Sequence, residues 1–576
     1  MLIGFLVFPA HKGVQKVNYL PWYDIVIMLL GTGAFLYFAF NAVDIIQQGS
    51  RFDTYQIIIG IVGILAVAEL CRRSVGLPIL IVAACFLVYG LIWGLSNPSF
   101  WGRLNYTVRY LFYSKEGLFS TPISVCSKFI VVFIIFGAFL ERTGIADFFI
   151  NISNAAVGGM SGGPAKVAVV VSAMEGMVSG SSVANTVGSG SVTIPLMKKT
   201  GYKPEFAAAA EASASTGGQI MPPIMGAAAF LMADYVQLPY STIVVKAILP
   251  AVLYFAGIFI AVHLEAKKLG LRGLRKDELP KFLPLLKQSY LLLHLILLIY
   301  LVSSNTRSIQ YAAAIAILAA IFVSIFNKDH RPTPKRLLEA LAAGGQGTIT
   351  VAAACAIAGI IAGTITMTGL ANMMINGIVA LAGSQTFIAL FLTMLCCIVL
   401  GMGVPTTANY CIMAATCAPI LIRMGVPAVA AHFFVFYFGI VADLTPPVAL
   451  AAYAGAAIAQ GNPMKTALTS TKLAIAAFIV PYVFALNPAM LLVDTTAFEV
   501  ILISITSIIG IFGVSAALEG YIMTAVPVPM RIASAVGGLL LIFPGVATDA
   551  LGLTLVALVL VQQLYVRKKT AVAQPM

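Results

Sequence analysis

Two short polar stretches interrupt a chain that is 60% apolar over 576 residues. GSSVAN begins at Gly180 and VPTTAN begins at Val404. Their hydroxyl and amide oxygens are hard ligands that suit a small cation. Broken backbone at membrane depth must be buried in protein or line a water-filled cavity, because lipid cannot satisfy free N–H and C=O groups. We therefore expect both stretches to face a binding site, through Gly180, Ser181, Ser182, Asn185, Thr406, Thr407 and Asn409.

A second interruption follows each stretch. These are STGGQIMPP at 215–223 and VADLTPP at 441–447. Proline removes a backbone donor and clashes with the preceding turn, so a double proline ends a helix and frees carbonyl groups. Exposed N-termini of half-helices favour an anionic substrate. One such break alone is more simply a packing kink, but four breaks at matched positions favour a binding site.

Three acidic residues lie within apolar segments. Glu175 precedes the first polar stretch, Glu211 follows it, and Asp443 lies in the second double-proline segment, at the position of Gln219 in the first. A charge at the centre of a bilayer costs about 3 kcal/mol or more, so such residues are functional by default. Glu211 and Glu175 are possible proton or coupling sites. The alternative is an acid that only bonds to a neighbouring helix for packing.

Signatures of enzymes and motors are missing. The sequence contains neither G-x-x-x-x-G-K-[ST] nor H-E-x-x-H. Its eight cysteines form no C-x-x-C pair, so a metal centre is not expected. We therefore predict no catalytic residues, no enzyme activity, no cofactor, and no metal beyond a transported sodium ion. The coupling ion is left open between sodium and a proton.

The elements that position these residues are expected to be membrane helices. Only 10% of the residues are charged, against about 25% in soluble domains. The basic residues behind the net charge of +13 lie mostly in short loops such as 265–281 and 327–336, which the positive-inside rule places in the cytoplasm. We therefore predict no nucleic-acid partner. Windows of spanning length lie near 24–44, 54–70, 77–95, 117–140, 242–264, 283–303, 308–326, 345–367, 384–402, 465–486, 497–516 and 546–566. The fold class predicted is an all-α polytopic membrane protein.

The chain also contains an internal repeat. At a constant offset of 224, Asn185 aligns with Asn409, and Gly201 aligns with Gly425. Three prolines align in the same way, Pro195, Pro222 and Pro223 with Pro419, Pro446 and Pro447. We predict two inverted-type repeats, at about 125–235 and about 350–460. Because the apolar arms on either side of each polar stretch are shorter than a span, each repeat should hold a re-entrant hairpin.

Three regions follow from this repeat. Residues 1–115 form helices outside it, residues 116–490 hold both repeats and a central pair of helices, and residues 491–576 form a helical tail.

Longer motifs carry a family resemblance. GGPAKVAVVVSAMEGMVSGSSVAN, the segment around TGGQIMPP, and GMGVPTTANY resemble the membrane component of tripartite ATP-independent periplasmic (TRAP) transporters. The resemblance is to the type in which the small and large permease subunits are fused and which works with a TAXI-type solute receptor. It covers nearly the whole chain. It implies that residues 1–115 are the small-permease scaffold and that 116–490 are the large-permease transport unit.

The resemblance further implies a function. Such members are secondary importers in the bacterial or archaeal cytoplasmic (inner) membrane, driven by sodium or protons. They take up a small organic anion delivered by an extracytoplasmic solute-binding protein, with an elevator-type motion of the domain that holds both hairpins. Glu175 departs from what the family leads us to expect. The residues placed at the unwound segments by the resemblance are Gly217, Gly218, Gln219, Pro222, Asp443, Thr445 and Pro446.

Two other functions fit the same sequence features. One is a stand-alone ion–carboxylate symporter that needs no receptor. The other is the membrane subunit of an ATP-driven importer, although such a subunit has no need for paired cation sites.

Overall fold

The computed structural model describes residues 1–10, 20–49, 52–304, 307–327, 330–383 and 385–572. Within these ranges the regular elements are helices, apart from one isolated bridge between Tyr521 and Ala525. The prediction of an all-helical polytopic membrane protein is confirmed, whereas the inverted repeats and the re-entrant hairpins stay predictions. Residues 328–329 of the predicted basic loop 327–336 lie outside the described residues.

Helices that are long and apolar enough to cross a membrane number eight in the described part of the chain. They cover Trp22–Phe40, Thr54–Ser74, Thr121–Glu141, Tyr240–Lys268, Pro334–Thr368, Pro463–Leu486, Ala497–Glu519 and Val546–Lys569. Shorter apolar helices, such as Thr386–Gly401 and Ala428–Val441, account for further predicted windows.

Two predicted windows differ from the helices that form. The window at 345–367 belongs to a much longer helix, α19 (Pro334–Thr368), which starts earlier because Thr333 caps it and Pro334 occupies its first turn. Its first turns carry charged residues, so hydropathy alone did not include them. The window at 283–303 is divided into α16 (Phe282–Leu286), a 3-10 turn (Ser289–Leu292) and α17 (Leu293–Ser303).

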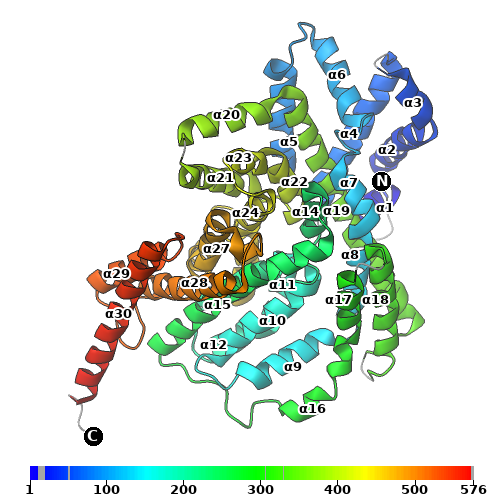
Figure 1. The fold of residues 1–576 in the computed structure, drawn as a ribbon. Coiled ribbons are helices and arrows are strands. Elements are labelled where there is room, and N and C mark those ends of the chain that lie inside the picture. Colours follow the sequence, from blue (N-terminus) through cyan, green and yellow to red (C-terminus); the bar gives the residue numbers. More distant parts are fainter. Residues whose placement is uncertain (11–19, 50–51, 305–306, 328–329, 384, 573–576) are drawn as a thin grey trace.

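The N-terminal helices lie together at one edge of the molecule, drawn in blue in Figure 1. They are α1 (Leu2–Val7), α2 (Trp22–Phe40), α3 (Ala42–Gln48), α4 (Thr54–Ser74), α5 (Pro78–Tyr89) and α6 (Phe100–Phe112). The helix α4 packs against α2, α6 and the long α19. This region is thereby attached to the rest of the fold along α19.

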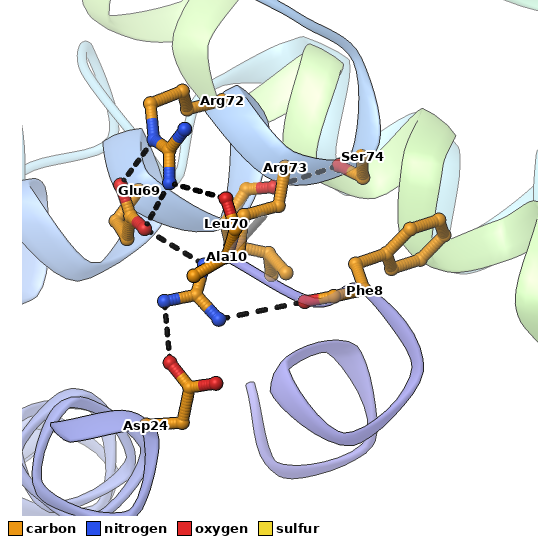
Figure 2. Close-up of polar contacts among 8 residues, drawn as sticks. All are labelled: Phe8, Ala10, Asp24, Glu69, Leu70, Arg72, Arg73 and Ser74. Atoms are coloured by element: carbon orange, nitrogen blue, oxygen red, sulfur yellow. Dashed lines mark hydrogen bonds and ion pairs between the residues drawn. The ribbon is translucent and has the colours of Figure 1, made fainter. Parts of the chain in front are cut away.

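A buried charge cluster joins three of these helices (Figure 2). Arg73 at the end of α4 donates from Nη2 to Asp24 Oδ1 at 2.6 Å and from Nε to Glu69 Oε1 at 2.7 Å. The side chains of Arg73 and Asp24 are 1% and 0% exposed. Arg73 also reaches the Phe8 carbonyl just beyond α1. Removing one member would leave an uncompensated buried charge, so the cluster holds the ends of α1, α2 and α4 together.

The polar stretches lie in two runs of helices with the same order. The first run is α9 (Ile145–Val157), α10 (Gly163–Ser179), α11 (Ser182–Gly188), α12 (Gly190–Lys199), α13 (Pro204–Gly218) and α14 (Ala228–Val236). The second is α20 (Leu370–Ala382), α21 (Thr386–Gly401), α22 (Thr406–Thr416), α23 (Ala418–Arg423), α24 (Ala428–Val441) and α25 (Leu450–Ala459). In Figure 1, α9–α12 lie in the lower part of the molecule and α20–α23 in the upper left.

Each polar stretch separates two helices at a glycine with a left-handed backbone. Gly180 (φ 60°) lies between α10 and α11, and Gly403 (φ 70°) lies between α21 and α22. Glycine adopts this conformation without the steric cost that a Cβ atom brings. The second interruptions lie after α13 and after α24, where the Pro222–Pro223 and Pro446–Pro447 peptide bonds are both cis.

The placement of Gly217 and Gly218 in an unwound segment is wrong. Both are the last residues of α13, and the chain leaves the helix only after Gly218. A Cβ atom on Gly218 would overlap the Cα of Gly176 in α10, and one on Gly217 would overlap the ring of Tyr254. These glycines therefore allow close helix packing, a use that the double proline nearby had obscured.

The C-terminal helices pack against the middle of the chain. They are α26 (Pro463–Leu473), α27 (Ile475–Leu486), α28 (Ala497–Glu519), α29 (Val528–Leu540) and α30 (Val546–Val572). The helix α28 lies along α15 (Tyr240–Lys268) and α27, while α29 and α30 extend away at the opposite edge from α1 (Figure 1). Glu519, at the end of α28, accepts a hydrogen bond from Lys472 of α26 at 2.9 Å. The tail is thus fixed to helices that precede it.

Candidate functional site

Both polar stretches reach one cavity. It has a volume of about 280 Å³ and is lined by Gly180 and Ser181 from the first stretch and by Thr407 from the second. The other walls come from α8 (Val131–Glu141), the start of α14, and α19. Segments more than 200 residues apart therefore meet around a space large enough for a small organic molecule.

A direct hydrogen bond also connects the first polar stretch to the second double-proline segment. Ser182 Oγ donates to Asp443 Oδ2 at 2.6 Å, and both residues are buried. Gln219, from the first double-proline segment, lies beside the same carboxyl group. Neither the nitrogen nor the oxygen of the Gln219 amide has a hydrogen-bond partner of good geometry among the described residues. Three of the predicted residues thus converge on one point, and Gln219 retains its hydrogen-bonding capacity there.

Asn185 and Asn409 have matching surroundings. Asn185 Nδ2 donates to the Ser172 carbonyl at 3.0 Å, and Asn409 Nδ2 donates to the Gly439 carbonyl at 2.9 Å. The two side chains are 3% and 1% exposed, and neither Oδ1 has a hydrogen-bond partner among the described residues. A buried carbonyl oxygen without a partner is costly unless something binds it. Each amide therefore offers one oxygen of the type that small cations prefer.

Several predicted residues do not line the cavity. Thr445 donates to the carbonyl of Val441 within its own chain segment. Pro222 and Pro446 form the turns after α13 and α24, and Thr406 begins α22. The structure places all of these next to the elements that bear the converging residues, without bringing them to the cavity wall.

Glu211 and Glu175 lie on neighbouring helices behind the first polar stretch. Glu211 on α13 is fully buried and accepts hydrogen bonds from the hydroxyl groups of Ser172, Ser189, Thr193 and Ser215. Glu175 on α10 lines a second cavity of about 300 Å³. No group of three or more His, Cys, Asp or Glu placed to hold a metal ion occurs in the described part of the chain.

Glu141 is a residue that sequence reasoning missed. It ends α8 and lines both cavities. Phe133 and Phe230, whose ring centroids are 4.5 Å apart, form an apolar wall of the first cavity. The sequence signal for Glu141 was its position directly after the predicted span 117–140. An acid at that position is equally typical of the start of a polar loop.

A model of a known family matches this chain over residues 62–498. The family is described as "Tripartite ATP-independent periplasmic transporter, DctM component". The chain belongs to this family. Its members are transporters, not enzymes, and TRAP transporters work with a periplasmic solute-binding protein and a small organic acid. The chain is thus a multi-pass membrane protein of the TRAP permease family.

Individual relatives have modest identity over most of their length. The C4-dicarboxylate TRAP transporter large permease protein DctM of Pseudomonas aeruginosa is 25% identical over 351 residues, 60% of this chain and 80% of the relative. A putative TRAP transporter large permease protein of Haemophilus influenzae is 27% identical over 324 residues, 55% of this chain and 74% of the relative. The C4-dicarboxylate TRAP transporter large permease protein DctM of Rhodobacter capsulatus is 24% identical over 344 residues, which cover 57% of this chain and 77% of the relative.

Proposed function

We propose that this TRAP permease imports a small organic anion across the cytoplasmic membrane, driven by a sodium or proton gradient. A TAXI-type solute-binding protein outside the membrane delivers the anion. The observation that carries the proposal is the cavity of about 280 Å³ where Gly180, Ser181 and Thr407 meet. Because relatives are named as C4-dicarboxylate permeases, C4-dicarboxylates are the first substrates to test.

The coupling ion binds near Asn185 and Asn409 in this proposal. Support comes from the buried Oδ1 atom of each amide, which has no hydrogen-bond partner among the described residues. One positive charge that moves inward down 100 mV releases about 2.3 kcal/mol. Two coupled cations would therefore supply about 5 kcal/mol to concentrate the anion.

The architecture of the proposal is two inverted-type repeats in an elevator. Each repeat, about 125–235 and about 350–460, holds a re-entrant hairpin, formed by α10–α12 in one and α21–α23 in the other. The matched order of helices and the left-handed glycines Gly180 and Gly403 support it. Residues 1–115 act as a fused small-permease scaffold, 116–490 as the transport unit, and 491–576 as an appended helical tail.

Uptake into vesicles tests the function. The purified permease is reconstituted with its solute-binding protein, and uptake of radiolabelled succinate and other small acids is measured under a sodium gradient, a proton gradient, both or neither. Uptake that needs the receptor and one of the gradients is expected. Uptake indifferent to both gradients contradicts the coupling. Uptake by the permease alone indicates a stand-alone symporter, and dependence on ATP indicates an ATP-driven importer.

A further inference from the structure

Glu211 is a buried acid that the proposed binding cavity does not use. Its side chain is 0% exposed, and Oε1 lies 2.7 Å from Ser172 Oγ, 2.6 Å from Ser189 Oγ and 3.2 Å from Ser215 Oγ. Oε2 is bonded to Thr193 Oγ1. None of the ion pairs in the described chain involves this carboxyl group. An acid enclosed in this way is stable when it carries a proton.

The hydrogen bonds around Glu211 have room for that proton. Thr193 Oγ1 also lies 3.1 Å from the carbonyl oxygen of Ser189, but a hydroxyl group has only one proton to donate. If Thr193 donates to the carbonyl, the Glu211–Thr193 bond needs a proton from Glu211 Oε2. The same shell of hydroxyl groups can therefore hold Glu211 either ionised or protonated, because Thr193 donates to the carboxylate in the first case and accepts from the carboxylic acid in the second.

A second cavity opens next to this site. It has a volume of about 300 Å³, and its lining includes the acids Glu141, Asp147 and Glu175. Asn185 lines the same cavity, is 3% exposed, and has no partner for Oδ1 among the described residues. A cavity lined by three acids and a buried amide is polar enough to hold water or a cation.

One hydroxyl group connects the cavity to Glu211. Glu175 Oε2 lies 4.0 Å from the position that a Cβ atom would take on Gly188, the residue before Ser189. The Ser189 hydroxyl lies 2.6 Å from Glu211 Oε1 and 2.8 Å from the Asn185 carbonyl oxygen. The order from the cavity inward is thus the Glu175 carboxyl group, the Ser189 hydroxyl group and the Glu211 carboxyl group.

We propose that Glu211 takes up and releases a proton, which reaches it from the acidic cavity through Glu175 and Ser189. In the inward step the carboxylic acid of Glu175 gives its proton to Ser189 Oγ, and the O–H bond of Ser189 breaks as its proton passes to the Glu211 carboxylate. Glu175 ends ionised, Ser189 unchanged and Glu211 protonated, so charge and atoms balance. The proposal rests on the proposed function, because it assigns one coupling ion of the importer to this site.

Several other titratable groups on the helices around α13 make their contacts elsewhere. These helices are α10, α11, α12, α15, α25 and α26. Glu175 on α10 is a titratable group on which the charge of Glu211 acts. The remaining contacts are Lys166 to His263, Lys198 to the Ala459 carbonyl, Lys472 to Glu519, Tyr254 to the Ser213 carbonyl and Tyr453 to the Pro447 carbonyl. The protonation of Glu211 therefore depends on its burial and on its shell of hydroxyl groups.

Infrared difference spectroscopy on the full-length permease in lipid tests the relay without substrate or receptor. The pH is stepped from about 5 to about 9 at constant sodium concentration, a range above the ordinary pKa of about 4 for carboxyl groups, so that solvent-exposed acids contribute little. We expect the wild type to lose the C=O stretch of a buried protonated carboxyl group. Glu211→Gln should remove this signal, and Ser189→Ala should slow its decay roughly tenfold or more. The exposed control Glu339→Gln should change neither.

The outcomes separate this proposal from the importer itself. A signal that survives in Glu211→Gln, or that follows sodium at constant pH, overturns the assignment and leaves the proposed function standing. If Glu211→Gln does not elute as a single species, Ser189→Ala decides, and an unchanged decay rate overturns the relay. Failure of the importer would instead be seen in the vesicles, as no uptake under any gradient.

Discussion

At the scale of single residues, Asn185 and Asn409 are a matched pair from the two polar stretches. Each amide holds one carbonyl group of a neighbouring helix and leaves its Oδ1 available. This arrangement separates two roles within one side chain, because Nδ2 fixes the position of the oxygen that would contact the cation. Both roles are lost together when the amide is replaced by an alkyl group of similar size.

Asn409→Leu should lower ion-driven uptake about tenfold or more. The substitution removes the free oxygen and leaves the Gly439 carbonyl unsatisfied, which costs about 1–3 kcal/mol. Asn185→Leu should behave in the same way at Ser172. Initial uptake rates in vesicles, with size-exclusion profiles as the check on folding, measure this effect. Asn372→Leu, at an exposed position on α20, is the matched control, and normal uptake in both buried variants would contradict the assignment.

Sequence reasoning could identify these amides but not all of their partners. The repeat offset and the broken helices pointed to Asn185, Asn409 and Asp443, because their types and spacing are local properties. The bond between Ser182 and Asp443 joins residues 261 apart, and the two cavities depend on how whole helices pack. Glu141 could not be assigned to a cavity wall for the same reason.

At the scale of elements, close packing of α10 on α13 positions the polar stretch and the acid. Gly176 in α10 lies directly against Gly218 in α13, so the two backbones approach each other without side chains between them. Hydropathy and proline patterns predicted approximately where most of the long apolar helices lie. They could not show that Gly217 and Gly218 serve packing, because a glycine beside a proline pair reads equally well as a break.

Gly176→Ala should destabilise the permease by about 1–3 kcal/mol. The new Cβ atom would overlap the Gly218 backbone, and overpacking of a close contact has this cost. Gly377→Ala is a matched control on α20, since nothing lies within 4 Å of a Cβ atom there. Thermal unfolding of both variants in the same detergent gives the comparison. Equal midpoints would mean that α10 and α13 can move apart freely.

At the scale of the whole molecule, α15 connects the polar stretches to the tail. It contacts α10 and α13 on one side and α27 and α28 on another. At its end, Lys268 approaches Glu519 of α28, which Lys472 of α26 also contacts. The tail therefore contacts α15, the helix that also packs against α10 and α13 with their acids Glu175 and Glu211. The sequence alone had indicated no role for residues 491–576.

Glu519→Gln should loosen the tail and lower the free energy of unfolding by about 1.5–3 kcal/mol, the value of a hydrogen bond to a charged group. Its carboxyl group is 2% exposed and holds Lys472 at 2.9 Å. A lower midpoint of thermal unfolding is expected, with Glu339→Gln on the exposed side of α19 unchanged. If Glu519→Gln unfolds at the wild-type temperature, the tail is held by apolar packing alone.

The pairing of Asp24 with Arg73 has a consequence for how the chain is made. The two residues are 49 positions apart, so at a synthesis rate of about 5–20 residues per second the ribosome needs about 2–10 s to supply the partner. During that interval α2 carries an acid that has no counter-charge, which disfavours its release into lipid. We expect the insertion machinery to retain α2 until α4 emerges and to release the two helices together. Insertion of α2 and α4 would then proceed as a pair of helices instead of one helix at a time.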